Sequence, residues 1–156
     1  MSQCHMLIFM QIMNKNRGTK MTKQAKTLEE FEVLHRSGTV EFIYKGFECL
    51  IRLAEWSGHL NGYVKVPKRH PAYFKDYDEL DIECHGGLSF SGFLTGRKGE
   101  RNWYIGFDCA HAGDLTPRIG EQFPMSNLLF GYEIWRDEKY VTDNLKTIVE
   151  QLIEME

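Results

Sequence analysis

Between Thr39 and Cys109 the chain divides into short segments rich in β-branched and aromatic residues, and this feature limits the possible folds most. The first two segments, residues 39–45 (TVEFIYK) and 47–56 (FECLIRLAEW), meet at a Lys-Gly turn. Apolar and polar residues alternate along the second, which is the pattern of a half-buried strand, so the pair predicts a β-hairpin. Further strands are predicted at residues 63–66, 82–85, 88–93 and 103–109, and together they favour an antiparallel sheet.

Two helices are predicted beside this sheet. Thr27 followed by Glu30 has the spacing of a capping box and opens a short helix that ends before Gly38. Asp137 is placed to cap a longer C-terminal amphipathic helix, whose apolar stripe must cover either the sheet or the same helix of a second copy. We therefore expect an α+β fold, and the second alternative predicts a homodimer. The stripe consists of Val141, Leu145, Ile148, Leu152 and Met155.

The length of 156 residues suits one hydrophobic core, which we assign to a single domain over residues 25–156. Five of the seven methionines fall within the first 21 residues, and residues 14–26 are polar and weakly patterned. Residues 1–24 are therefore predicted to be a poorly ordered tail or an over-extended start, with Met21 as the working start.

Charge and cysteine usage exclude several classes of partner. The formal net charge is −3 and the basic residues are scattered, so duplex nucleic acid is not an expected partner. The apolar run at residues 6–13 is too short to cross a bilayer and lacks the features of an export signal. The four cysteines contain no C-x-x-C pair, which predicts reduced thiols in a cytoplasmic protein; they are Cys4, Cys49, Cys84 and Cys109.

Two glycine-containing bends carry the candidate site. The triplet His85-Gly86-Gly87 is predicted at a strand end, where it forms either a tight turn or an anion-binding backbone. Residues 106–114 (GFDCAHAGD) gather titratable side chains among small residues, which suits close approach to a ligand. If the two bends meet, they form one pocket, and its predicted ligand-binding residues are His85, Gly86, Gly87, Trp103, Asp108, His111 and Asp114.

Three chemistries compete for this pocket, and a structural explanation stands beside them. A divalent metal could be held by the histidines and aspartates, although no H-E-x-x-H or similar spacing is present. Cys109 could act as a nucleophile activated by a histidine. In the leading hypothesis the site binds a nucleotide-like or phosphorylated small molecule without catalysis, metal or cofactor, and aromatic residues stack on it. Alternatively, Asp108 and Asp114 cap the loop while His111 bridges them.

Several stretches resemble a family of small proteins encoded by bacteriophages and prophages: YVKVPKRHPAYFKDYDEL, ECHGGLSFSG and WYIGFDCAHAGD. The similarity covers residues 61–114 and, more loosely, the final helix. It implies a viral origin and a location in the host cytoplasm, and it implies no catalytic residue. Phage accessory proteins commonly act on host processes, so sequestration of a nucleotide defence signal is one expectation. A second is a metal- or thiol-dependent hydrolase, and a third is an inhibitor that binds a host protein through Phe130, Tyr132 and Trp135.

Overall fold

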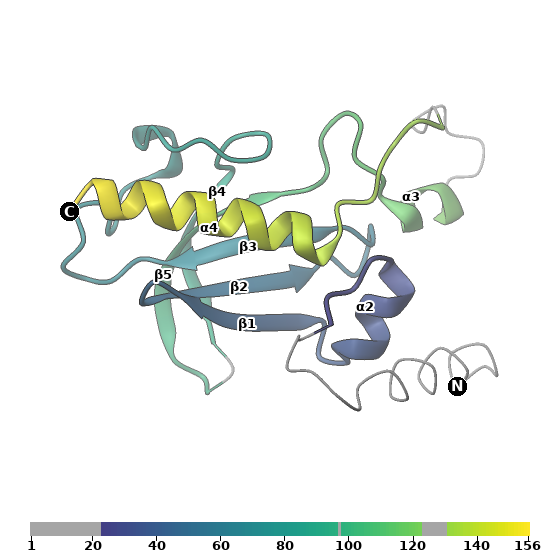
Figure 1. The fold of residues 1–156 in the computed structure, drawn as a ribbon, viewed down its shortest axis with the longest axis horizontal. Coiled ribbons are helices and arrows are strands. Elements are labelled where there is room, and N and C mark those ends of the chain that lie inside the picture. Colours follow the sequence, from purple (N-terminus) through teal and green to yellow (C-terminus); the bar gives the residue numbers. More distant parts are fainter. Residues whose placement is uncertain (1–22, 97, 123–130) are drawn as a thin grey trace.

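The computed structural model describes residues 23–96, 98–122 and 131–156, which form an α+β fold built on one antiparallel sheet. The sheet has five strands in the order β1-β2-β3-β5-β4, and every neighbouring pair is antiparallel (Figure 1). The predicted fold class is therefore confirmed. The strands are β1 (Thr39–Tyr44), β2 (Phe47–Leu53), β3 (Leu60–Lys65), β4 (Phe90–Thr95) and β5 (Arg101–Asp108).

The predicted hairpin of β1 and β2 is confirmed, and its turn fixes the register. Tyr44 pairs with Phe47, so the loop consists of Lys45 and Gly46 alone. Both residues have positive φ, 46° and 85°, which is the conformation of a type I′ turn. Because side chains alternate between the faces of a sheet, this register places Ile51 on the opposite face from Leu50.

The C-terminal helix α4 (Glu138–Glu154) covers one face of the sheet, where it contacts β2 and β3 (Figure 1). Asp137 caps it as predicted, since its carboxylate accepts a hydrogen bond from Tyr140 N at 2.8 Å. Four stripe residues are fully buried, whereas Met155 lies at the C-terminal cap and is exposed. Burying each of these aliphatic side chains stabilises the fold by about 1.5–3 kcal/mol. The buried four are Val141, Leu145, Ile148 and Leu152.

This packing resolves the alternative posed by the apolar stripe. The stripe covers the sheet of its own chain, so it offers no free surface to a second copy. The reason for expecting a homodimer through this helix is therefore removed.

The short helix α2 (Leu28–Leu34) is also confirmed, and Thr27 accepts a hydrogen bond from Glu30 N at 3.1 Å. Its one buried residue, Phe31, joins the core. Glu138 at the start of α4 connects α4 to the segment that contains α2. Its carboxylate accepts a hydrogen bond from Ala25 N at 2.7 Å and lies 3.0 Å from His35 Nε2.

The strand predicted at residues 82–85 does not form. The backbone of this segment forms hydrogen bonds with side chains of α4 instead of a neighbouring strand. Gln151 accepts from Glu83 N and donates to Glu83 O, at 2.7 and 2.8 Å. Strand-like composition does not say which partner satisfies the backbone.

The structure also differs from the predicted elements in other places. The third strand begins at Leu60, three residues before the predicted start. A short 3-10 helix, η1 (Tyr77–Glu79), interrupts the loop after β3, and the connection after β5 contains the helix α3 (Pro117–Gln122), which was not predicted. Proline at the first position of α3 is compatible with a helix, because its missing N–H has no intrahelical partner there.

Most of the predicted tail, residues 1–22, lies outside the described residues. Gln24 already contacts α4 through a hydrogen bond from its Nε2 to Thr142 Oγ1 at 3.2 Å, and Ala25 is buried. Within the described ranges, no helix combines the length and apolar character needed to span a membrane.

Candidate functional site

The His85-Gly86-Gly87 triplet forms a β-turn after the extended segment that α4 holds. Gly87 N donates a hydrogen bond to Cys84 O at 2.9 Å, and Gly86 has a φ of 68°, which strongly favours glycine at the third position of such a turn. His85 N donates to Asn144 Oδ1 on α4 at 2.8 Å. The amides of His85 and Gly87 are thus used in the fold, which weakens the hypothesis that this backbone binds an anion.

The second bend follows β5 and is closed by its own aspartates. Asp108 Oδ1 accepts a hydrogen bond from Ala110 N at 3.4 Å, and Asp114 Oδ2 accepts one from His111 N at 3.0 Å. These hydrogen bonds are the ones expected if Asp108 and Asp114 simply cap the loop. Asp114 also lies at a contact with a second segment. A β-bridge between Asp114 and Ile134 joins this bend to the part of the chain that enters α4.

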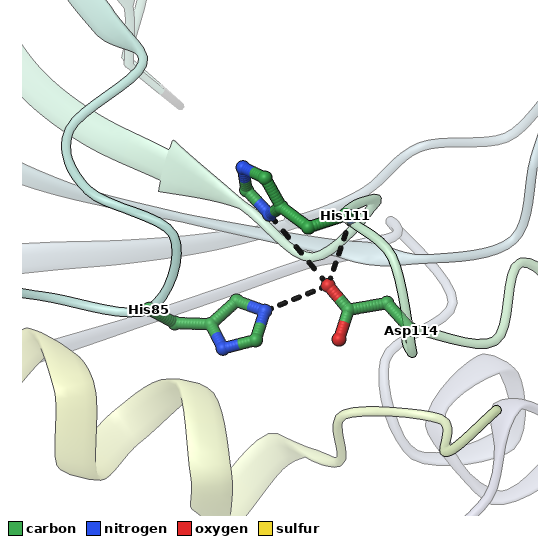
Figure 2. A group of neighbouring side chains, drawn as sticks. All are labelled: His85, His111 and Asp114. Atoms are coloured by element: carbon green, nitrogen blue, oxygen red, sulfur yellow. Dashed lines mark hydrogen bonds and ion pairs between the residues drawn. The ribbon is translucent and has the colours of Figure 1, made fainter.

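The two bends meet at Asp114, as predicted. His85 Nε2 lies 2.7 Å from Asp114 Oδ2, and Arg136 Nε donates to Asp114 Oδ1 at 2.7 Å. Figure 2 shows the two histidines approaching this carboxylate from separate segments. The Asp114 side chain is fully buried, and burial alone would raise its pKa. Hydrogen bonds from Arg136, His85 and the His111 amide outweigh burial and lower the pKa, so Asp114 is a carboxylate.

Tyr140 on α4 fixes the orientation of the His85 ring. Its hydroxyl lies 2.7 Å from His85 Nδ1, and the two rings meet nearly edge to face, with centroids 5.2 Å apart. Nε2–H donates to Asp114, because an imidazole lone pair 2.7 Å from a carboxylate oxygen would be repelled, and Tyr140 then donates to Nδ1 of the neutral ring. A metal bound at Nε2 would require the opposite tautomer, with Nδ1–H donating to Tyr140.

His111 is the accessible member of the group, with 37% of its side chain exposed. Its Nδ1 lies 3.3 Å from Asp108 Oδ1 and 3.7 Å from Asp114 Oδ2. It forms no hydrogen bond with either oxygen, and the atom itself is shielded from solvent. One nitrogen of His85, one of His111 and one oxygen of Asp114 all lie within 4.8 Å of one another. We call these three residues the His-His-Asp cluster.

Trp103 lies away from this cluster, contrary to prediction. It is four residues before Phe107, which contacts His85, and four residues of strand span about 13 Å. Its indole is largely buried and packs against Phe74 and Phe93, with ring centroids 4.9 and 5.2 Å away. Strand geometry explains the difference, since residues at opposite ends of β5 cannot line one small pocket.

Cys109 is placed as a core residue and not as a nucleophile. It is 1% exposed, and burial, followed by the charges of Asp114 and Asp108, raises its pKa far above the usual range. The thiol therefore stays protonated at neutral pH, whereas nucleophilic cysteines need a thiolate.

We expect Cys109 in the native protein to react with iodoacetamide only as fast as the protein unfolds, because both access and thiolate are lacking. Peptide mass spectrometry after timed alkylation measures this rate for each cysteine. Cys49, which is also buried, is the internal comparison. Rapid modification of Cys109 at pH 7 in folded protein would restore the thiol hypothesis.

Sequence reasoning did not include Arg136 and Tyr140, although both contact the cluster. The available signal was the spacing of Tyr140 and Asn144, which places both on one side of the helix capped by Asp137. Sequence spacing alone could not show that this side faces His85, because the two segments are 55 residues apart.

Gly86 also positions His111. A Cβ atom at residue 86 would lie 2.4 Å from His111 Cε1, well inside van der Waals contact. We therefore expect Gly86→Ala to displace the His111 ring and to weaken any ligand bound by the His-His-Asp cluster at least tenfold, although no ligand atom is removed. Gly87→Ala is the matched control, since it also has positive φ but its Cβ would meet no atom within 4 Å. Equal weakening by both variants would assign the effect to backbone strain.

Comparison with known proteins adds no relative for this chain: no family model, no curated protein and no solved structure matches it.

Proposed function

We propose that the protein binds a divalent transition-metal ion through His85, His111 and Asp114, and that this ion holds a small phosphorylated ligand. The observation that carries the proposal is the convergence of two imidazole nitrogens and one carboxylate oxygen within 4.8 Å. Imidazole and carboxylate are the usual ligands of zinc and related ions in hydrolytic and binding sites.

The nitrogen of His111 that lacks a hydrogen bond supports the proposed metal site. A shielded imidazole nitrogen normally has a hydrogen-bond partner, yet His111 Nδ1 has none and meets the two carboxylates only at ion-pair distance. Such a nitrogen is suited to donate its lone pair to a metal ion.

The distances require only a small adjustment. Metal–ligand bonds of about 2.0–2.2 Å place neighbouring ligands of a tetrahedral ion about 3.3 Å apart. His111 Nδ1 and Asp114 Oδ2 are 3.7 Å apart, and His85 Nε2 and Asp114 Oδ2 are 2.7 Å apart. The His85–Asp114 contact must therefore lengthen by about 0.6 Å to admit an ion of this size.

The local charge also favours a cation over a directly bound anion. Asp108 and Asp114 contribute two negative charges against the single positive charge of Arg136, if both histidines are neutral. A phosphate placed here without a metal would face net repulsion, and a divalent ion reverses this balance. The leading sequence hypothesis, which needed no metal, is revised for this reason.

Arg136 supplies the second contact for a phosphoryl group. It uses Nε to bind Asp114, and its terminal nitrogens have no hydrogen-bond partner in the described part of the chain. Its guanidinium lies over the Tyr140 ring, 4.9 Å from the centroid, which holds it beside the cluster. Guanidinium groups pair well with phosphate oxygens, and a metal with three protein ligands keeps a position open for another oxygen.

Hydrolysis of the ligand is a second candidate function, favoured by this open position. A metal held by His85, His111 and Asp114 would lower the pKa of a bound water toward neutrality and make it a nucleophile. Asp108, with 39% of its side chain exposed beside His111, is placed to accept the proton of such a water.

Calorimetry with inorganic phosphate and adenosine monophosphate tests the proposal. Protein stripped with EDTA and reloaded with one equivalent of Zn²⁺ should bind at least one probe, and the stripped protein should bind neither. In the reloaded protein Arg136→Lys, which keeps the charge but loses the fork of donors, should weaken binding about tenfold. Equal affinity with and without metal would overturn the metal-dependent part. Release of phosphate from the nucleotide would select the hydrolase.

A further inference from the structure

A second pocket lies on the opposite face of the sheet from α4. It has a volume of about 260 Å³ and is lined by residues of β1, β2 and β5 and by Glu100. The strand register shows which face this is. Leu50, which lines the pocket, follows Cys49 and precedes Ile51, and the cross-strand partner of Ile51 is Gly62, whose Cβ position lies 3.0 Å from Leu145 of α4. Leu50 therefore points away from α4.

Three carboxylates surround this pocket. Glu41 and Glu100 form no ion pair and no side-chain hydrogen bond within the described ranges. Glu48 is paired with Lys65, which lies outside the lining. The other nearby cation, Arg52, donates a hydrogen bond to Thr95 O at 2.8 Å. Even counting both cations, the formal charge of this region is −1.

Tyr104 places an unpaired hydroxyl at this pocket. Its side chain lines the pocket and the residue is only 7% exposed, yet its hydroxyl has no hydrogen-bond partner among the residues described. Burial raises the pKa of Tyr104, and the charges of Glu48, Glu41 and Glu100 raise it further. The hydroxyl thus lies in the negative field of all three carboxylates, which favours a cation beside it.

The pocket walls also contain apolar surface. Leu50, which is 3% exposed, and Ile43, which is 71% exposed, both line the pocket. An aliphatic chain fits against these two side chains while its charged end meets the carboxylates. The volume is below the roughly 300–1,000 Å³ of sites for drug-sized molecules, so the occupant is small.

We propose that the pocket lined by Glu41, Glu100 and Tyr104 binds a small aliphatic ammonium compound, with its charged nitrogen between the carboxylates and its chain on Leu50 and Ile43. A bare metal ion does not fit, because the carboxylates are too widely spread. Among the described residues only His85, His111 and Asp114 bring metal-binding atoms within 4.8 Å of one another. The site is independent of the proposed metal centre.

Nuclear magnetic resonance titration with 1,4-diaminobutane tests this inference. The methyl signals of Ile43 and Leu50 should shift with saturable binding, and uncharged 1-butanol should cause no saturable shift. The double variant Glu41→Gln/Glu100→Gln should weaken diamine binding at least tenfold, and Tyr104→Phe should weaken it by a smaller factor. The control Glu29→Gln/Glu121→Gln changes the net charge equally at exposed positions and should leave affinity unchanged.

Two outcomes would overturn the inference: no saturable shift at 20 mM diamine (roughly the weak limit of specific ligands), or equal weakening by the pocket and control variants, which would indicate nonspecific attraction. His111→Ala should not affect diamine binding, so a failure of the diamine site can be distinguished from a failure of the metal site.

Discussion

His111→Ala is expected to weaken the binding of Zn²⁺ at least 100-fold while the fold persists. The substitution removes one of three proposed ligands, and even the loss of a partner behind a ligand lowers metal affinity about 10–100-fold. The cost to the apoprotein should be small, because the His111 side chain is 37% exposed and its Nδ1 has no hydrogen-bond partner. Calorimetric titration with Zn²⁺ measures the affinity, and circular dichroism verifies the fold.

Two further variants sharpen this prediction. Tyr140→Phe removes the hydroxyl 2.7 Å from His85 Nδ1 and should weaken zinc binding about tenfold through loss of orientation. His35→Ala is the matched histidine control, because His35 pairs with Glu138 and does not belong to the cluster. Unchanged zinc affinity in His111→Ala would show that the cluster holds no metal.

Asp114→Asn is expected to lower the free energy of unfolding of the metal-free protein by about 2–4 kcal/mol. The Asp114 carboxylate is fully buried and accepts hydrogen bonds from Arg136 and from His111 N, with His85 Nε2 at 2.7 Å. The neutral amide leaves the Arg136 charge without its partner and replaces an accepting oxygen with a donor. Urea denaturation in EDTA measures the change. Asp108→Asn, with a side chain that is 39% exposed, should cost under about 1 kcal/mol.

Acid should reduce the difference in the free energy of unfolding between the wild-type protein and Asp114→Asn. The pKa of Asp114 is lowered in the folded protein, so its contribution to stability is present above the unfolded value of about 4 and is lost as the pH falls through the folded pKa. The unfolding curves of wild type and Asp114→Asn should therefore converge in strong acid. A constant gap between them from pH 7 to pH 2 would show that Asp114 acts through shape and not through its charge.

Much of the framework could be predicted from local patterns. The turn at Lys45-Gly46, the caps at Thr27 and Asp137 and the stripe on α4 each depend on neighbours within a few residues. Such features follow from spacing and residue type alone, so these elements and the fold class were predicted correctly.

The errors came from contacts between distant segments. The segment at residues 82–85 has strand composition, but side chains of α4 bind its backbone. Trp103 shares a strand with Asp108 and still lies in another part of the core. Spacing identified the members of the His-His-Asp cluster, whereas their support from Arg136 and Tyr140 required the folded arrangement.

Nitrogen-15 spectra of the histidine rings during Zn²⁺ addition test the central claim most directly. We predict that one equivalent of zinc shifts His85 Nε2 and one ring nitrogen of His111, and that His85 Nδ1 becomes the protonated nitrogen, which donates to Tyr140. The signals of His35, His59 and His70 should stay in place. If zinc leaves the signals of both His85 and His111 unchanged, or shifts the signals of all histidines alike, the cluster only stabilises the fold and the proposed metal site is wrong.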